Sequence, residues 1–261
     1  MASDEARQIV ASIAALPEDP LPQTEPLRAI CAADFYEIPT PQIEPLLGAL
    51  VVRGKRHILA AATGDGKTTM VQHMLRAIVH GTDFAGFTGI GGDVRVLVVD
   101  LEQTVDDIQR LLRETELTTC TQIDYVHAPD GIDLNDEVEA GMLEAIIREG
   151  GYALVVLDPA YKMHSGDSND EQDTMRLMRR LDGWRSKYGF ALMIPMHCRK
   201  LPAGVRFTIN EVFGSTTWVR GAETILGLQI LGEGVSRLHF WKARSGGLPV
   251  RAHWDLTLHR D

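Results

Sequence analysis

The sequence predicts an α/β protein in which a mostly parallel β-sheet lies between helices and is extended by antiparallel strands near the C-terminus. Three observations predict this class. From Leu46 onward, short apolar runs alternate with helical patterns, which is typical of a parallel sheet covered by helices. A glycine-containing loop joins the first strong strand to a helix. Beyond Thr224 the helical patterns stop, and strand-like segments follow at 224–231, 235–241 and 249–258.

The individual elements follow from hydrophobic periodicity. Apolar runs predict strands at 58–60, 94–101, 123–126, 153–157 and 190–196. Gly81 ends the first helix of this region and Thr104 begins the second. The expected apolar faces of the four successive helices are Met70, Met74, Leu75 and Ile78; Val105, Ile108 and Leu112; Val138, Met142 and Ile146; and Met175, Met178, Leu181 and Trp184.

Residues 1–45 do not show the alternation of strands and helices that begins at Leu46. Residues 3–16 form an amphipathic helical pattern, and a proline-rich connector and a short helix at 27–35 follow. We expect residues 1–45 to be a helical arm or linker that packs on a neighbour or on its own core; a partly ordered tail is the alternative. Residues 46–261 form the expected main domain.

Composition limits the classes that remain. An apolar fraction of 44% and a charged fraction of 24% are those of an ordinary globular protein. No apolar run is long enough to span a bilayer and no basic leader precedes one, so we expect a cytoplasmic protein without membrane contact. Cys31, Cys120 and Cys198 lack metal-ligand spacing and are expected to be free thiols. A net charge of −10 argues against extensive basic patches, so any nucleic-acid contact must be local.

The segment from Ala61 to Thr68, Ala-Ala-Thr-Gly-Asp-Gly-Lys-Thr, has the spacing of a phosphate-binding loop between a strand and a helix. Small residues let backbone N–H groups surround phosphate oxygens, and the helix N-terminus adds a positive dipole end. Lys67 is expected to reach the β- and γ-phosphates of ATP, and the Thr68 hydroxyl to ligate Mg²⁺. The one departure is Ala61, where the pattern asks for glycine. The predicted nucleotide-binding residues are Thr63, Gly64, Asp65, Gly66, Lys67, Thr68 and Thr69.

Polar residues close the predicted strands, and the carboxyl ends of parallel strands meet at one edge of a sheet. Asp158 follows a buried run, where NTPases place the carboxylate that holds Mg²⁺. Glu102 is a candidate for polarising the attacking water, but Asp100 is on the same face and spacing alone does not decide between them. His197 is a candidate for sensing the γ-phosphate, although a lone strand-end histidine is more often structural. Its neighbour Cys198 is a weaker candidate, as a nucleophile.

The segment 198–214 carries basic residues but little regular pattern. We expect Arg199, Lys200 and Arg206 to contact nucleic acid; a solvated surface loop is the competing interpretation.

Together these motifs resemble the RecA-like P-loop ATPases of the DnaB and RepA hexameric helicase type, over roughly residues 40–255. The resemblance rests on the segment 61–68, on Val-Leu-Val-Val-Asp-Leu-Glu at 96–102, on Leu-Val-Val-Leu-Asp-Pro at 154–159 and on Met-Ile-Pro-Met-His at 193–197. Phe-Trp-Lys-Ala-Arg at 240–244 is similar to the family's lysine-x-arginine finger.

The resemblance implies that Glu102 is the catalytic carboxylate, Asp158 the magnesium aspartate and His197 the sensor. It further implies that Lys242 and Arg244 reach the nucleotide of an adjacent subunit in a homo-oligomer, as in a hexameric ring on single-stranded DNA. A replication loader or primase is an implied partner. The 45 residues before the main domain are too few for a primase-docking domain, so the chain is most similar to a minimal RepA-like motor.

The leading hypothesis is therefore an ATP-driven, ring-forming DNA helicase or translocase. The first alternative is a DNA-associated ATPase similar to RecA, RadA or KaiC that assembles or regulates without unwinding. The second is a nucleotide-binding assembly module with negligible hydrolysis.

Overall fold

The computed structural model of the chain describes residues 29–39, 42–164, 171–199, 207–212, 217–232, 235–244 and 253–257. The helix expected at 3–16, the proline-rich connector, Lys200 and Arg206 lie outside these residues. The chain divides into two units, Met1–Gln42 and Ile43–Asp261, each of which is described by itself.

The first unit contains one short helix in its described part, α2 (Ala32–Tyr36). The extended backbone of Cys31 begins it, and the Cys31 sulfur accepts the N–H of Asp34 at 3.4 Å. The helix therefore begins later than the expected residue 27. Every described residue from 29 to 39 is exposed, so this unit has no core of its own in that range.

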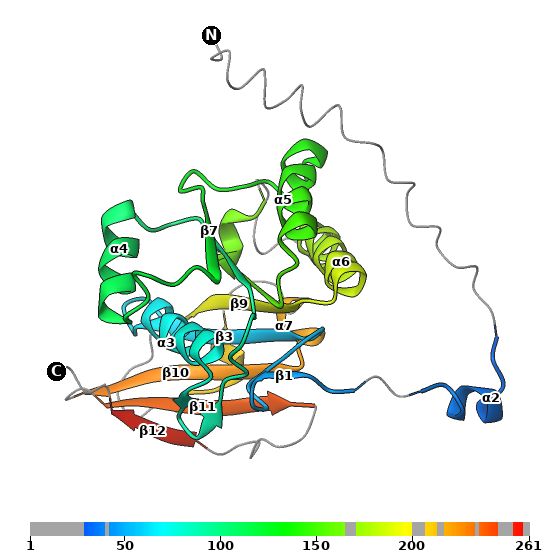
Figure 1. The fold of residues 1–261 in the computed structure, drawn as a ribbon, viewed down its shortest axis with the longest axis horizontal. Helices are drawn as coiled ribbons and strands as arrows, with labels where there is room; N and C mark the ends of the chain where they lie inside the picture. The colour runs from blue at the N-terminus through cyan, green and yellow to red at the C-terminus, as the bar shows by residue number, and fades with distance from the viewer. Residues whose placement is uncertain are drawn as a thin grey trace, which may run out of the picture. The chain divides into compact units, whose positions relative to one another are not determined.

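The second unit is built on an eight-stranded sheet in the order β12-β11-β10-β3-β9-β8-β6-β7, part of which Figure 1 shows from β9 down to β12. Its strands are β3 (Arg56–Ala62), β6 (Val96–Asp100), β7 (Ile123–His127), β8 (Leu154–Asp158), β9 (Ala191–Cys198), β10 (Thr224–Gly232), β11 (Val235–Ala243) and β12 (His253–Thr257). β10 pairs parallel with β3, and the antiparallel part begins at β11. The predicted fold class is confirmed. The one difference is β10, which was expected in the antiparallel extension and pairs parallel with β3.

Helices cover this sheet, and two small hairpins accompany it. The helices are α3 (Lys67–His80), α4 (Val105–Glu114), α5 (Glu137–Gly150), α6 (Glu171–Tyr188) and α7 (Thr217–Arg220), with 3-10 turns η1 (Ala160–Lys162) and η2 (Ile209–Glu211). The hairpins pair β1 (Pro45–Leu47) with β2 (Val51–Val52), and β4 (Asp83–Phe84) with β5 (Phe87–Thr88). As predicted, α3 ends at a left-handed Gly81 and Thr104 caps α4 by accepting the N–H of Asp107. No helix in the described ranges is long and apolar enough to cross a membrane.

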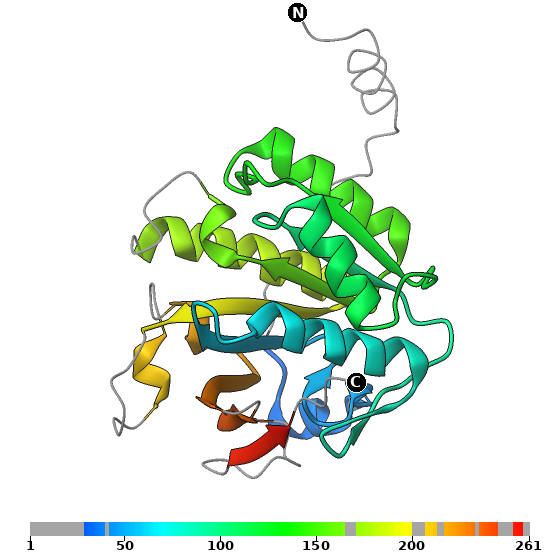
Figure 2. The same cartoon turned by 90° about the vertical axis from the view of Figure 1, so that its left-hand side faces the viewer.

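Strand alternation divides the core into two clusters. In β3, Leu59 and Ala61 belong to the cluster that contains α3, whereas Ile58 and Ala60 belong to the one that contains α5, α6 and α7. Figure 2 shows α3, in cyan, running along the sheet. Because both faces are covered, the central strands contain uninterrupted apolar runs, as the sequence predicted, and their polar residues lie at the strand ends.

Two helices bury a different face from the one their apolar spacing suggested. On α5, Val138, Met142 and Ile146 are 64%, 42% and 38% exposed. The buried residues of α5 are Ala140, Leu143 and Ile147. Both stripes have helical spacing, so periodicity alone could not choose between them.

The second such helix is α4. Val105 is 54% exposed, and the buried residue is Leu111. The apolar face expected for α4 was therefore partly wrong: the helix contacts α3, and Leu112 packs against the cluster that contains α3.

Candidate functional site

Two glycines shape the loop between β3 and α3. Gly64 and Gly66 have φ values of 86° and 76°, a left-handed region in which a side chain is strained. Gly66 is also the N-cap of α3, and its carbonyl accepts the first helical bond from Met70 N–H at 2.9 Å. The N–H groups of the first turn therefore have no partner within the helix, which makes this end of α3 suited to an anion.

Ala61, the departure from the phosphate-loop pattern, lies inside β3 rather than in the loop. It is fully buried and pairs with His197 of β9 and Leu228 of β10. Its backbone keeps a negative φ. Alanine is accommodated because no left-handed conformation is required at this position.

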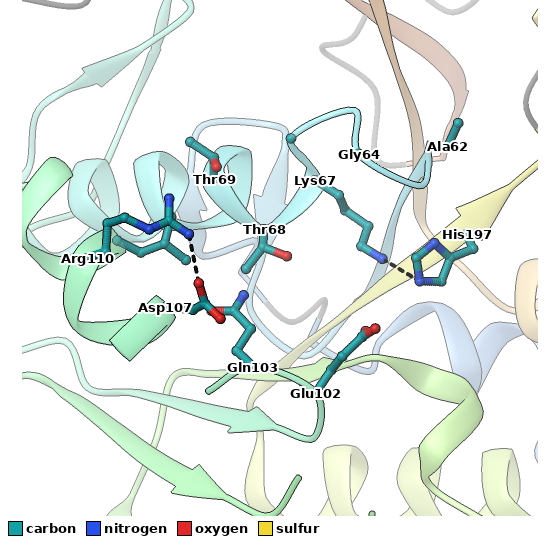
Figure 3. A pocket seen from close by; sticks show the side chains of 12 residues that line it. Ala62, Gly64, Lys67, Thr68, Thr69, Glu102, Gln103, Asp107, Arg110 and His197 are labelled. Atoms are coloured by element: carbon teal, nitrogen blue, oxygen red, sulfur yellow. Dashed lines mark hydrogen bonds and ion pairs between the residues drawn. The ribbon is translucent and has the colours of Figure 1, made fainter. Parts of the chain in front are cut away.

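A cavity of about 420 Å³ follows the loop (Figure 3). Four parts of the chain line it: the loop with the first turn of α3, the residues after β6, one face of α4, and the end of β9. The lining residues are Ala62, Gly64, Gly66, Lys67, Thr68, Thr69, Glu102, Gln103, Asp107, Arg110, Leu111 and His197. A second cavity, of about 710 Å³, borders the loop from its other side at Gly64, Asp65, Gly66 and Thr69.

Asp158, at the end of β8, lies beside the loop. Its Oδ2 accepts the Thr68 hydroxyl at 3.2 Å, and its Oδ1 is 3.7 Å from the Lys67 ammonium. All three groups belong to the set predicted from the sequence, and the fold brings them together.

The charge at Asp158 is poorly compensated. Burial raises the pKa of this carboxyl to about 6; Lys67 opposes the rise, and the neighbouring Asp100 and Glu102 add to it. An additional cation would therefore stabilise the ionised form. Carboxylate and hydroxyl oxygens are hard donors that suit Mg²⁺, which typically takes only one or two protein ligands and completes its shell with phosphate and water. Among the described residues there is no group of three or more His, Cys, Asp or Glu that could hold a metal ion.

The structure separates the two acidic candidates at the end of β6. Asp100 is 4% exposed, and its Oδ1 accepts the backbone N–H groups of Glu102 at 3.1 Å and Gln103 at 2.8 Å. Glu102 lines the cavity, and Figure 3 shows its carboxylate directed toward Lys67 and His197. Asp100 thus holds the turn that presents Glu102.

His197, at the end of β9, connects to the loop through both ring nitrogens. Its Nε2 is 3.4 Å from Lys67 Nζ and its Nδ1 is 3.4 Å from Thr63 Oγ1. An ammonium can only donate, so Nε2 accepts from Lys67 and the Nδ1–H donates to Thr63. Burial and the nearby Lys67 lower the pKa of His197, which keeps the ring neutral near pH 7.

A proline separates the strands at this point. β8 and β9 pair only from Leu154 and Ala191 to Val156 and Met193. Pro195 has no N–H to donate to a ladder. The ends of β8 and β9 are therefore not hydrogen-bonded to each other where Asp158 and His197 face the loop.

The α4 wall of the cavity was not predicted from the sequence. Gln103, Asp107, Arg110 and Leu111 line it, and Arg110 Nη2 donates to Asp107 Oδ1 at 3.0 Å. The signal was present, because residues 107, 110 and 111 share one face of a helix that begins beside Glu102.

Lys242 and Arg244 lie away from this cavity. Lys242 Nζ donates to the carbonyls of Val219 and Arg220 at 3.2 and 3.1 Å, and Arg244 Nη2 donates to the same Arg220 carbonyl at 3.4 Å. These acceptors belong to α7.

Among the basic residues expected to contact nucleic acid, Arg199 is described. It is exposed directly after β9, and its backbone N–H donates to the Glu211 carbonyl at 2.9 Å. The neighbouring Cys198 is buried, and burial raises the pKa of its thiol to about 12, which makes it a poor nucleophile.

A glycine loop at a helix N-terminus, with a lysine and a threonine that line one cavity and a strand-end aspartate bonded to that threonine, defines a P-loop nucleotide-binding ATPase domain. Sequence comparison agrees: the AAA domain family (AAA_25) matches residues 22–203, and the chain belongs to that family. The predicted resemblance to RecA-like P-loop ATPases is thereby confirmed.

Comparison of structures supports the same fold. The chain is similar to the solved ATPase domain of another protein, with a TM-score of 0.57 and 13% sequence identity over 78% of this chain and 81% of that one. As many as 627 solved chains show significant likeness, so the fold alone does not specify a function. No curated protein sequence matches significantly.

Proposed function

We propose that this protein is a Mg-ATP-dependent, ring-forming DNA helicase or translocase that hydrolyses ATP between subunits. In one subunit, Lys67 and the first-turn N–H groups of α3 bind the phosphates, and Thr68 and Asp158 hold Mg²⁺. Glu102 orients the attacking water. His197, hydrogen-bonded to Lys67, responds to the γ-phosphate.

One observation carries the oligomeric part of this proposal. Lys67, in the loop, and the Lys242–Arg244 pair lie toward opposite ends of the strands of the sheet. Lys242 pairs with Ile225, which is level with Ile58 of β3, whereas the loop follows Ala62. Four residues of strand separate these levels by about 13 Å, with β10 also intervening. Lys242 therefore cannot reach the cavity of its own subunit. It can contact the transferred phosphate only in the cavity of another copy of the chain.

The similar solved structure is itself an ATPase domain, which supports the same chemistry here. Contact with single-stranded DNA rests on the basic residues Arg199, Lys200 and Arg206, which follow β9, the strand that carries His197. A loader or primase partner remains part of the proposal because of the sequence resemblance.

Mass in solution tests assembly. We expect a single copy or a small species without nucleotide, and a ring with Mg-ATP and a single-stranded oligonucleotide. A single copy under every nucleotide condition would refute the ring.

ATP turnover and strand displacement test the motor. We expect DNA to stimulate turnover, and the Lys200→Ala, Arg206→Ala double variant to lose the stimulation while retaining basal turnover. Displacement of a labelled strand distinguishes a helicase from a RecA-, RadA- or KaiC-like assembly, which would hydrolyse ATP without displacing it. Negligible turnover in wild type would favour an assembly module instead.

A further inference from the structure

The strand that carries Lys242 contains a β-bulge at Trp241. Ile225 of β10 pairs with Lys242, and the next residue, Leu226, pairs with Phe240, so Trp241 has no partner across the ladder. An extra residue of this kind interrupts the alternation of side chains and redirects those that follow.

The redirection is visible in the packing. Phe240 belongs to the α3 cluster and Ala243 packs against it, whereas Trp241 packs against the cluster that contains α7. Lys242 lies on the same side as Trp241, because its ammonium donates to the Val219 and Arg220 carbonyls of α7. Without the bulge, Lys242 would share the face of Phe240.

Phe207 holds the bulged residue. It is 7% exposed, and its ring centroid lies 4.8 Å from that of Trp241 and 5.4 Å from that of His239, both edge-on. The indole is also fitted to Gly227, where a Cβ would come within 2.3 Å of the ring. Trp241 therefore packs closely on the β10 backbone and contacts the Phe207 ring.

Phe207 is also tied to the end of the strand that carries His197. Cys198 and Val212 form an antiparallel bridge, and Arg199 N–H donates to the Glu211 carbonyl at 2.9 Å. Residues 207–212, which include Phe207, thus end beside Cys198 and Arg199, directly after His197 at the cavity.

We propose that Phe207 is a positioning residue for the Lys242–Arg244 pair. By fixing Trp241 in the bulge, Phe207 sets the direction of both cationic side chains. It also links their position to the end of β9, beside His197. This rests on the proposed role of the pair in a neighbouring subunit's site. A displacement of about 1 Å in such a group can reduce turnover about 100-fold.

Mixed assemblies of the full chain test the proposal. One component, Lys242→Ala, has an intact loop and lacks the cation; the other, Lys67→Ala, has the cation and a disabled loop. If the cation acts between subunits, mixing restores turnover. The Lys67→Ala component is then also made with Phe207→Ala, and separately with Phe87→Ala.

Phe87 is a matched control. It is 8% exposed and also packs on β11, but its ring neighbours are Phe240 at 6.4 Å and Trp254 at 4.9 Å rather than the bulged Trp241. We expect the Phe87→Ala component to restore turnover and the Phe207→Ala component to restore it about tenfold less, through a lower kcat at unchanged KM for ATP.

Equal restoration by all three components would overturn the role of Phe207 and leave the intersubunit cation standing. Loss of restoration with both phenylalanine variants would also overturn it, because the effect would not depend on the bulge. If even the unmodified Lys67→Ala component restored nothing, the intersubunit site itself would be wrong, and the inference would fall with it.

Discussion

Replacing Asp158 with asparagine should stabilise the nucleotide-free protein. The pKa of this carboxyl is raised from 3.8 to about 6, chiefly by burial. Between these two pH values the folded state binds more protons than the unfolded state, so the contribution of Asp158 to stability falls as pH rises. Asparagine keeps an acceptor for the Thr68 hydroxyl, which is 3.2 Å away, and carries no charge.

The magnitude follows from the size of the pKa rise. A rise of about 2 corresponds to about 3 kcal/mol once the pH exceeds both values. In a protein of this size, that is a rise in Tm of about 6–12 °C. The gain of Asp158→Asn over wild type should be complete at pH 8 and absent near pH 4.

Thermal unfolding at pH 8 and at pH 4 measures this difference, with the exposed Asp93→Asn as a control that should change little at either pH. Mg-ATP should then raise the Tm of wild type more than that of Asp158→Asn. With ATP and a chelator, the rise in Tm of wild type should not exceed that of the variant. A variant less stable than wild type at pH 8, or a gain that does not depend on pH, would refute the reasoning.

Three further changes test other parts of the structure. Glu102→Gln should retain ATP binding in an equilibrium titration and lose about 100-fold or more in turnover; unchanged turnover would exclude Glu102 as the group that orients water. Val138→Glu should alter the free energy of unfolding by less than about 0.5 kcal/mol, whereas Leu143→Ala should lower it by about 2–4 kcal/mol; the reverse order would mean that α5 buries its other face. In the native protein a thiol reagent should modify the exposed Cys31, and reach Cys198 only on unfolding; rapid labelling of Cys198 in the folded state would contradict its burial and raised pKa.

Several parts of the site could be predicted from the sequence because their chemistry is local. A strand, two glycines, a lysine and a helix are adjacent in the chain, so spacing alone places Lys67 and Thr68 at a helix N-terminus. Asp158 and His197 are far apart in sequence, but each ends a strand, and parallel strands end at one edge of the sheet.

Other features depended on contacts that spacing does not contain. The choice between Asp100 and Glu102 depended on two backbone N–H groups that Asp100 accepts in a turn. The bulge at Trp241 depended on the register between β10 and β11.

Local sequence was enough to specify the fold class, the order of the elements and the phosphate loop, because hydrophobic periodicity and glycine conformation act over a few residues. Long-range packing was needed to select the buried face of α5, the carboxylate that faces the cavity and the direction of Lys242. In each of these cases the alternatives are nearly equal in local energy, and contacts with residues distant in the chain select one.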